Sequence, residues 1–126
     1  MSKAEDVVNT MIDACNRKDI EAALACFHED VVYHNIPMEP VTGREGVRKT
    51  LGPFLDMAQQ VDWITHKSVS NGVDLVMNER NDRLLMPHGW CDLPVMGVFE
   101  VRDGKIAAWR DYFDSAAVQA LLGGGS

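Results

Sequence analysis

The spacing of the apolar residues changes once along this chain, and that change limits the folds available to it. Apart from one early strand, apolar residues up to about residue 58 recur at helical spacing, whereas from Val61 onward they alternate with polar residues. Helices followed by long strands are typical of an α+β domain, in which the helices cover one face of a sheet. We therefore expect an α+β fold with N-terminal helices packed on a curved sheet.

Two helices are expected near the start of the chain. Ser2 and Glu5 have the spacing of a capping box, and apolar residues recur at helical spacing as far as Cys15. A second, short helix follows with Asp19 as its N-cap, and its apolar spacing predicts an end near His28.

A third helix is predicted after the first strand. Thr42 and Glu45 repeat the capping-box spacing, and apolar residues at helical spacing continue to about Ala58. Gly52-Pro53 lies within this segment, and because proline lacks a backbone N–H it should kink or shorten the helix. A short last helix is expected around residues 115 to 122.

The sheet is predicted to have five strands. Residues 31 to 36 are rich in β-branched and aromatic side chains and are followed by prolines. The later strands are separated by the turn sequences Asn71-Gly72, Pro87-His88-Gly89 and Asp103-Gly104, and cover residues 61 to 69, 73 to 86, 90 to 102 and 105 to 113. Because Asn-Gly and Asp-Gly are typical of tight hairpins, we expect these later strands to form an antiparallel meander.

Size and charge narrow the functional classes. A chain of 126 residues suits one domain, expected over residues 1 to 122, with residues 123 to 126 as a flexible tail or an added linker. A net charge of −7, with 12 scattered Lys and Arg residues, argues against a nucleic-acid partner. The chain has neither a signal-sequence pattern nor a run of roughly 20 apolar residues, so we expect no membrane partner and a cytoplasmic location.

The sequence predicts no cofactor and no metal. Cys15, Cys26 and Cys91 are odd in number and far apart, which suits reduced thiols packed as small apolar residues. The 4 histidines lack the spacing of zinc ligands. Neither a glycine-rich phosphate loop after a strand nor a Gly-x-Ser-x-Gly turn occurs.

An ion pair is predicted on one face of the strand over residues 73 to 86. Successive side chains of a strand point to opposite faces, so Arg80 and Asp82 point the same way, in a row whose ends are apolar. This pattern is expected for an ion pair inside an apolar cavity. The alternative left open by the spacing is a surface pair that stabilises the fold by at most ~1 kcal/mol.

Two other strands carry polar side chains in apolar surroundings. Asp111 shares a face with Trp109 and Phe113, and a buried carboxylate there would need a partner; the alternative is a solvated strand end. Tyr33 and Asn35 share a face of the first strand, where they could hold a water molecule. The alternative for the tyrosine is a place at the edge of the core.

Together these segments resemble the bacterial-type limonene-1,2-epoxide hydrolase family. They read Tyr33-His34-Asn35-Ile36-Pro37, Glu79-Arg80-Asn81-Asp82 and Gly104-Lys105-Ile106-Ala107-Ala108-Trp109-Arg110-Asp111-Tyr112-Phe113-Asp114. The similarity extends from about Val32 to Phe113, and the Glu-Arg-x-Asp and Trp-Arg-Asp-Tyr-Phe-Asp stretches are its specific parts. The resemblance implies a cystatin-like (NTF2-like) cone with a curved mixed, mainly antiparallel sheet, and a homodimer formed across that sheet.

By this resemblance, Asp111 is expected to be the general base, Asp82 the general acid and Arg80 the link between them. Tyr33 and Asn35 are expected to help fix the attacking water. His34 and Asn81 depart from the family pattern and should face away from the pocket. The residues expected to line the substrate pocket are apolar: Leu84, Leu93, Val95 and Phe113, with Met86 on the same strand rows and Met57 or Trp63 from the helical cover.

The resemblance implies that a small apolar epoxide, cyclic or terpenoid-like, is hydrolysed to a diol without a cofactor. Two carboxyl groups in opposite protonation states suit this reaction, because one can activate water while the other protonates the epoxide oxygen. Two alternatives remain open. One is a ketosteroid-isomerase-like or polyketide-cyclase-like enzyme of the same cone, in which an aspartate abstracts a carbon-bound proton. The other is a non-catalytic module that binds a small ligand.

Overall fold

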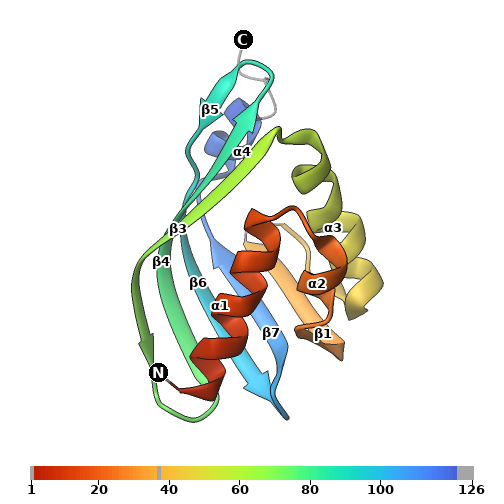
Figure 1. The fold of residues 1–126 in the computed structure, drawn as a ribbon, viewed down its shortest axis with the longest axis vertical. Helices are drawn as coiled ribbons and strands as arrows, with labels where there is room; N and C mark the ends of the chain where they lie inside the picture. Colours follow the sequence, from red (N-terminus) through yellow and green to blue (C-terminus); the bar gives the residue numbers. More distant parts are fainter. Residues whose placement is uncertain (1, 37, 122–126) are drawn as a thin grey trace.

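The chain forms a curved sheet with helices against one face (Figure 1). The computed structural model describes residues 2 to 36 and 38 to 121, so the expected tail at residues 123 to 126 lies outside the described residues. The elements in chain order are α1 (Lys3–Asn16), α2 (Ile20–Leu24), β1 (Phe27–Ile36), β2 (Val41–Thr42), α3 (Gly43–Met57), β3 (Gln60–Ser70), β4 (Leu75–Met86), β5 (Gly89–Cys91), β6 (Pro94–Arg102), β7 (Lys105–Tyr112) and α4 (Ser115–Leu121).

The sheet is mixed and mainly antiparallel, as predicted. Its strands follow the order β2-β1-β7-β6-β4-β3, and β5 pairs with β4. β1 runs parallel to β7, whereas the other pairs are antiparallel. The parallel pairing sets Tyr33 beside Trp109 and Asn35 beside Asp111, so the first predicted strand lies against the last one.

The predicted starts of α1 and α2 are confirmed. Ser2 Oγ accepts a hydrogen bond from the Glu5 amide at 3.1 Å, and the Glu5 carboxylate accepts one from the Ser2 amide, which completes the capping box. Asp19 caps α2 by accepting from the Ala22 amide at 3.0 Å. Both caps satisfy amides that have no partner within their own helix.

The start of α3 differs from the prediction. Within the described part of the chain, the Thr42 side chain makes no capping hydrogen bond. Thr42 is instead held in β2 opposite Val32, and Gly43 begins the helix with a φ of 77°, which favours glycine. The helix then runs through Pro53 to Met57, close to its predicted end near Ala58, so the proline does not shorten it.

The boundary between α2 and β1 also differs. α2 ends at Leu24 rather than near His28, and β1 begins at Phe27 rather than Val31. Phe27 pairs with Ile106 of β7 and is fully buried, and its ring stacks on Trp109 with the centroids 5.8 Å apart. Long-range pairing and burial therefore override the helical spacing of this segment.

The predicted strand over residues 90 to 102 is two strands. β5 ends at Cys91 and β6 begins at Pro94. Between them, the Leu93 amide donates to Asn81 Oδ1 at 3.1 Å, and the Leu93 carbonyl accepts from the Asp82 amide at 2.8 Å. These bonds hold the two intervening residues out of the regular ladder.

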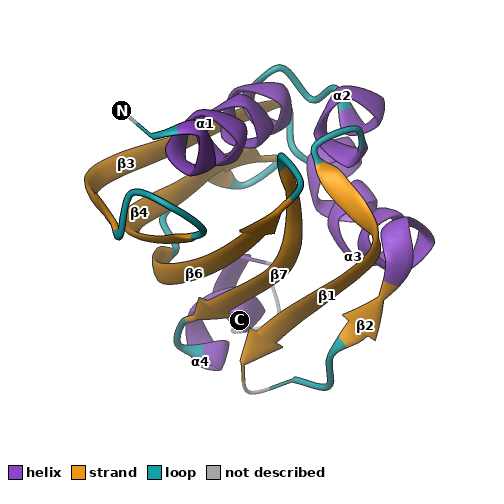
Figure 2. Ribbon diagram, turned by 90° about the horizontal axis from the view of Figure 1, so that it is seen from below, coloured by secondary structure: helices purple, strands orange, loops and turns teal. Residues whose placement is uncertain are grey.

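The core lies between the helices and the sheet (Figure 2). Trp109 of β7 is fully buried at its centre, and the rings around it are those of Phe27, Tyr33, Trp63 and Phe99. Four strands meet at these rings, so the position of β7 and of its polar residues is closely defined.

Candidate active site

β4 carries a row of buried polar side chains toward the helices. Along β4, Val76, Asn78, Arg80, Asp82, Leu84 and Met86 are all buried, and the residues between them are not. The side chain of Arg80 has 0% of its surface exposed, and that of Asp82 has 6%. The predicted common face is confirmed, and the alternative of a surface ion pair is wrong.

Arg80 joins the two predicted carboxylates. Its Nε and Nη2 donate to the two oxygens of Asp82, both at 3.0 Å, and Nη2 also donates to Asp111 Oδ2 at 2.9 Å. Its third nitrogen, Nη1, donates to Asn78 Oδ1 at 2.8 Å. Every nitrogen of the guanidinium therefore has an acceptor, as a buried cation requires.

Asp111 is held from two sides on β7. Oδ2 binds Arg80, and Oδ1 accepts a hydrogen bond from the indole N–H of Trp109 at 2.7 Å. The side chain is 6% exposed, so the alternative of a solvated strand end is wrong. Sequence reasoning placed Trp109 on the correct face but did not anticipate its hydrogen bond to Asp111.

Burial and charge act in opposite directions on these groups. Burial raises the pKa of Asp82 to about 6, with Arg80 opposing the rise and Asp111 adding to it. Burial alone would lower the pKa of Arg80, but Asp111 and Asp82 raise it above its ordinary value, so the guanidinium stays charged. Asp82 can therefore exchange its proton near neutral pH.

Tyr33 and Asn35 lie beside Asp111 on the parallel strand β1. The Tyr33 ring stacks on Trp109 with the centroids 4.3 Å apart. Burial raises the pKa of the Tyr33 phenol, and the charge of Asp111 adds to this, while a hydrogen bond with Asn35 opposes it. The phenol is therefore neutral and can donate a proton into a hydrogen bond.

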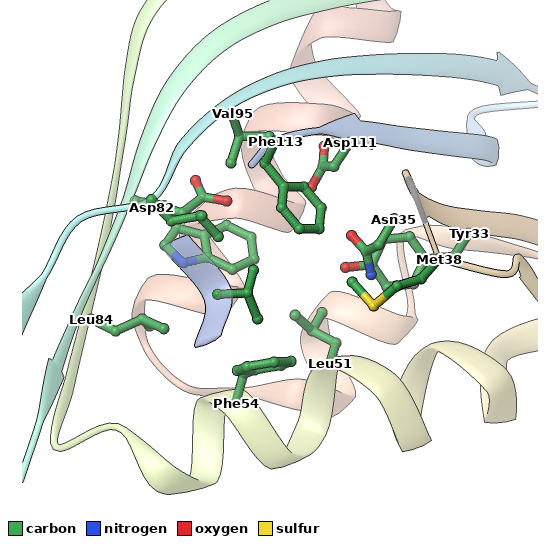
Figure 3. A pocket seen from close by; sticks show the side chains of 13 residues that line it. Tyr33, Asn35, Met38, Leu51, Phe54, Asp82, Leu84, Val95, Asp111 and Phe113 are labelled. Atoms are coloured by element: carbon green, nitrogen blue, oxygen red, sulfur yellow. The ribbon is translucent and has the colours of Figure 1, made fainter. Parts of the chain in front are cut away.

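A cavity opens beside the carboxylates (Figure 3). Its empty space is about 550 Å³ when the open solvent at its mouth is included. Its wall consists mainly of apolar side chains with a few polar ones: Tyr33, Asn35, Met38, Leu51, Phe54, Trp63, Asp82, Leu84, Leu93, Val95, Asp111, Phe113 and Val118. Arg80 lies behind the carboxylates and is not part of this wall.

The four residues predicted to bind substrate, Leu84, Leu93, Val95 and Phe113, all line the cavity. Trp63 lines it too, although from β3 and not from the helices. Met86 and Met57 are not among the lining residues: Met86 is part of the core, and Met57 is 45% exposed.

Sequence reasoning missed several residues of the site. Leu51 and Phe54 project into the cavity from α3 (Figure 3), and their spacing of three on one helix face was a usable signal. Met38 and Val118 also line it, but they lie in a loop and in the last helix, where periodicity carries no such information. Asn78 shares the buried face of β4 with Arg80 and Asp82, and its role there depends on contacts that sequence periodicity does not show.

His34 and Asn81 lie away from the cavity wall, as expected. His34 Nε2 is 2.7 Å from the Met38 carbonyl oxygen, and Asn81 interacts with the segment between β5 and β6. Within residues 2–36 and 38–121, no group of three or more His, Cys, Asp and Glu side chains is arranged to hold a metal ion. In the same residues, no helix is long and apolar enough to cross a membrane.

Comparison with known proteins identifies the family. Residues 2–122 match the family model described as the limonene-1,2-epoxide hydrolase catalytic domain. Epoxide hydrolase EphG of Mycobacterium tuberculosis is 32% identical over 109 residues, which cover 85% of this chain and 70% of EphG.

Solved structures agree with this assignment. The structure of an M. tuberculosis LEH-like epoxide hydrolase matches with a TM-score of 0.81 at 29% identity, over 97% of this chain and 91% of that one. An NTF2-like protein of unknown function from Cytophaga hutchinsonii matches with a TM-score of 0.76 at 19% identity, over 94% and 96% of the two chains. The predicted NTF2-like cone is thus confirmed, and the chain belongs to the limonene-1,2-epoxide hydrolase family.

Proposed function

We propose that this protein adds water to a small apolar epoxide, cyclic or terpenoid-like, and releases a vicinal diol in one step. The observation that carries the proposal is the position of Arg80 Nη2, which donates to both Asp82 and Asp111 beside the cavity. An Arg cation, one carboxylate and one carboxylic acid sum to zero charge, so the cluster can be buried with one proton shared by the aspartate pair.

In the proposed mechanism, Asp111 is the general base and Asp82 the general acid. Asp111 takes a proton from a water molecule that Tyr33 and Asn35 orient, and the water oxygen bonds to an epoxide carbon. The bond from that carbon to the epoxide oxygen breaks, and Asp82 gives its proton to the departing oxygen. The diol leaves Asp111 protonated and Asp82 ionised, and proton exchange within the pair restores the starting state.

The wall of the cavity favours an apolar substrate. Leu84, Leu93, Val95 and Phe113 provide apolar contact around the carboxylates, and Leu51 and Phe54 provide it from α3. Arg80 is the one buried cation among the residues that the structure describes, and it is already engaged by two carboxylates, which argues against an anionic substrate. Such a surface binds a cyclic or terpenoid-like epoxide mainly through burial of its hydrocarbon part.

The first experiment is hydrolysis of limonene-1,2-epoxide and cyclohexene oxide in oxygen-18 water, with enzyme in excess over substrate. We expect the label in the diol from the first turnover, because water attacks the carbon directly. Unlabelled diol in the first turnover, with label in an enzyme carboxylate, would instead indicate a covalent ester and overturn the mechanism. If neither these epoxides nor other apolar epoxides are hydrolysed, the proposed activity is wrong.

A further inference from the structure

We propose that Asn78 and Gly97 are positioning residues, which together hold the Arg80 guanidinium where it can bind Asp82 and Asp111 at once. This inference rests on the proposed function, because it assigns these residues to the acid and base pair of that reaction. Neither residue lines the cavity, so both would act through Arg80.

The register of the sheet places these residues in one row. Asn78 of β4 lies opposite Gly97 of β6, and Gly97 lies opposite Asp111 of β7. Arg80 belongs to β4, two residues from Asn78, so its side chain must reach across β6 to bind Asp111. Gly97 lies on that route.

Gly97 is required for space and not for backbone conformation. Its φ is outside the left-handed region that favours glycine. A Cβ at this position would lie 2.4 Å from Arg80 Nη1, 2.8 Å from Asn78 Oδ1 and 2.9 Å from Asp111 Oδ1. Any side chain at this position would clash with these three polar atoms and displace them.

Asn78 binds Nη1, the guanidinium nitrogen that donates to neither aspartate. Its Oδ1 accepts from Nη1 at 2.8 Å, while its Nδ2 is buried and has no hydrogen-bond partner among the described residues. An unpaired buried donor is destabilising, and an apolar side chain of the same size would avoid it. The bond that Asn78 does make to Arg80 is therefore the physical reason for an amide at this position.

Substitution of Asn78 or Gly97 should break a hydrogen bond through which Arg80 joins Asp82 to Asp111. Nη2 serves both carboxylates, so a small rotation of the guanidinium breaks one of its two bonds. Asp82 interacts with Arg80 on its own strand, with Asp111 on β7, and with the Cys15 thiol of α1 and the Tyr33 phenol of β1. Burial raises the pKa of both Cys15 and Tyr33, so these two groups are neutral. Arg80 is therefore the charged group that stabilises the ionised form of Asp82.

The test compares Gly97→Ala with Gly52→Ala as its matched control. No heavy atom of the described residues lies within 4 Å of a Cβ built on Gly52, apart from its own helix and chain neighbours. We expect Gly97→Ala to lower kcat for epoxide hydrolysis about 100-fold with little change in KM, as displacement of a catalytic group does. Gly52→Ala should keep the wild-type kcat and KM.

A second pair of variants separates the hydrogen bond from the volume of Asn78. Asn78→Leu keeps the number and branching of the side-chain heavy atoms and removes the acceptor, whereas Asn78→Asp keeps an acceptor of the same shape. At the pH optimum of each variant, we expect kcat to fall at least tenfold in Asn78→Leu and to be largely retained in Asn78→Asp. If Gly97→Ala does not fold, this pair alone decides the proposal.

A titration that needs no turnover completes the test. Carbon-13 NMR of the aspartate carboxyl carbons follows the pKa of Asp82, which is identified by its absence in Asp82→Asn. We expect this pKa to rise in Gly97→Ala and Asn78→Leu, because Arg80 compensates the charge less well, and to stay unchanged in Gly52→Ala. If these variants keep the wild-type kcat and pKa, the inference is wrong while the hydrolase proposal stands; if the wild type hydrolyses no epoxide, the proposed function fails first.

Discussion

Asp82 and Asp111 are both buried against Arg80, but they make different contacts. Asp82 accepts two bonds from the guanidinium, whereas Asp111 accepts one from the guanidinium and one from Trp109. This asymmetry supports different roles for two side chains of the same chemistry. Their roles as acid and base stay predictions, as do those of Arg80, Tyr33 and Asn35.

Asp82→Asn and Asp111→Asn are each expected to fold and to lose epoxide hydrolysis by several orders of magnitude. An amide has nearly the same shape as a carboxyl group, but it can neither give up the proton of the acid nor accept that of the base. The measurement is single-turnover diol formation beside a circular dichroism spectrum. Asp62→Asn, at an exposed ion pair, is the control. Near-normal turnover in either buried variant would contradict the pairing.

Asp82 should also make the stability of the protein depend on pH. The folded-state pKa is raised from 3.8 to about 6, so the folded state holds this proton more tightly than the unfolded state does. The contribution to stability is complete below about pH 4 and is lost as the pH rises through 6. Because each pH unit corresponds to about 1.4 kcal/mol, the loss is roughly 3 kcal/mol.

Asp82→Asn removes this pH dependence while it leaves Arg80 paired with Asp111. Relative to the wild type, its free energy of unfolding should therefore increase between pH 4 and pH 7, by up to roughly 3 kcal/mol. Urea unfolding at both pH values measures the difference. A constant difference between the two proteins would show that the pKa of Asp82 is not raised by folding.

At the scale of an element, the two predicted capping boxes provide a direct comparison. Ser2 caps α1 through its hydroxyl, whereas the Thr42 side chain makes no such bond within the described residues. Ser2→Ala should lower the free energy of unfolding by about 1 kcal/mol. Thr42→Ala should lose nothing through capping, and thermal unfolding of the two variants tests this. Equal losses would contradict the assignment of the caps.

The break between β5 and β6 positions part of the cavity wall. Asn81 Oδ1 accepts from the Leu93 amide, and Leu93 lines the cavity. In Asn81→Ala, Leu93 loses this anchor, so we expect KM for an apolar epoxide to rise up to roughly fivefold, the equivalent of about 1 kcal/mol, with a smaller effect on kcat.

Asp92→Ala is the matched control for Asn81→Ala. It removes the hydrogen bonds that Asn81 and Arg83 donate to Asp92, but it leaves the bond between Leu93 and Asn81 in place. Its KM should stay near the wild-type value in the same steady-state assay. An equal rise of KM in both variants would contradict this. It would mean that the whole segment between β5 and β6, and not the bond between Asn81 and Leu93, positions this part of the cavity wall.

At the scale of the whole molecule, we propose a homodimer formed across the face of the sheet opposite the helices. This face presents Met77, Met96 and Tyr112, which are exposed in the single chain. Burial of such apolar side chains favours association. Light scattering after size exclusion should give twice the chain mass of 14.0 kDa.

A charge on this face should lower the measured mass. Met96→Lys places an ammonium within the apolar patch and is expected to give a mass of 14.0 kDa. Met57→Lys is the control, because Met57 is equally exposed but lies on α3. A wild-type protein that is monomeric at micromolar concentration would contradict the proposal.

Local sequence patterns are enough to predict which side chains share a face of each helix or strand. Alternation along β4 placed Arg80 and Asp82 on one face, and the residues around Trp109 and Asp111 carried the family resemblance. Helix caps at Ser2 and Asp19 could be predicted because a cap depends on residues three positions apart. These features are local, so a single sequence contains the information.

Which elements lie next to one another depends on long-range packing. Pairing of β1 with β7 drew Phe27 out of the predicted helix, and the register of β4, β6 and β7 brought Arg80 to Asp111 across Gly97. Met38 and Val118 joined the cavity wall only because distant parts of the chain converge there. Long-range register depends on how the whole core packs, and hydrophobic periodicity within one segment does not contain that information.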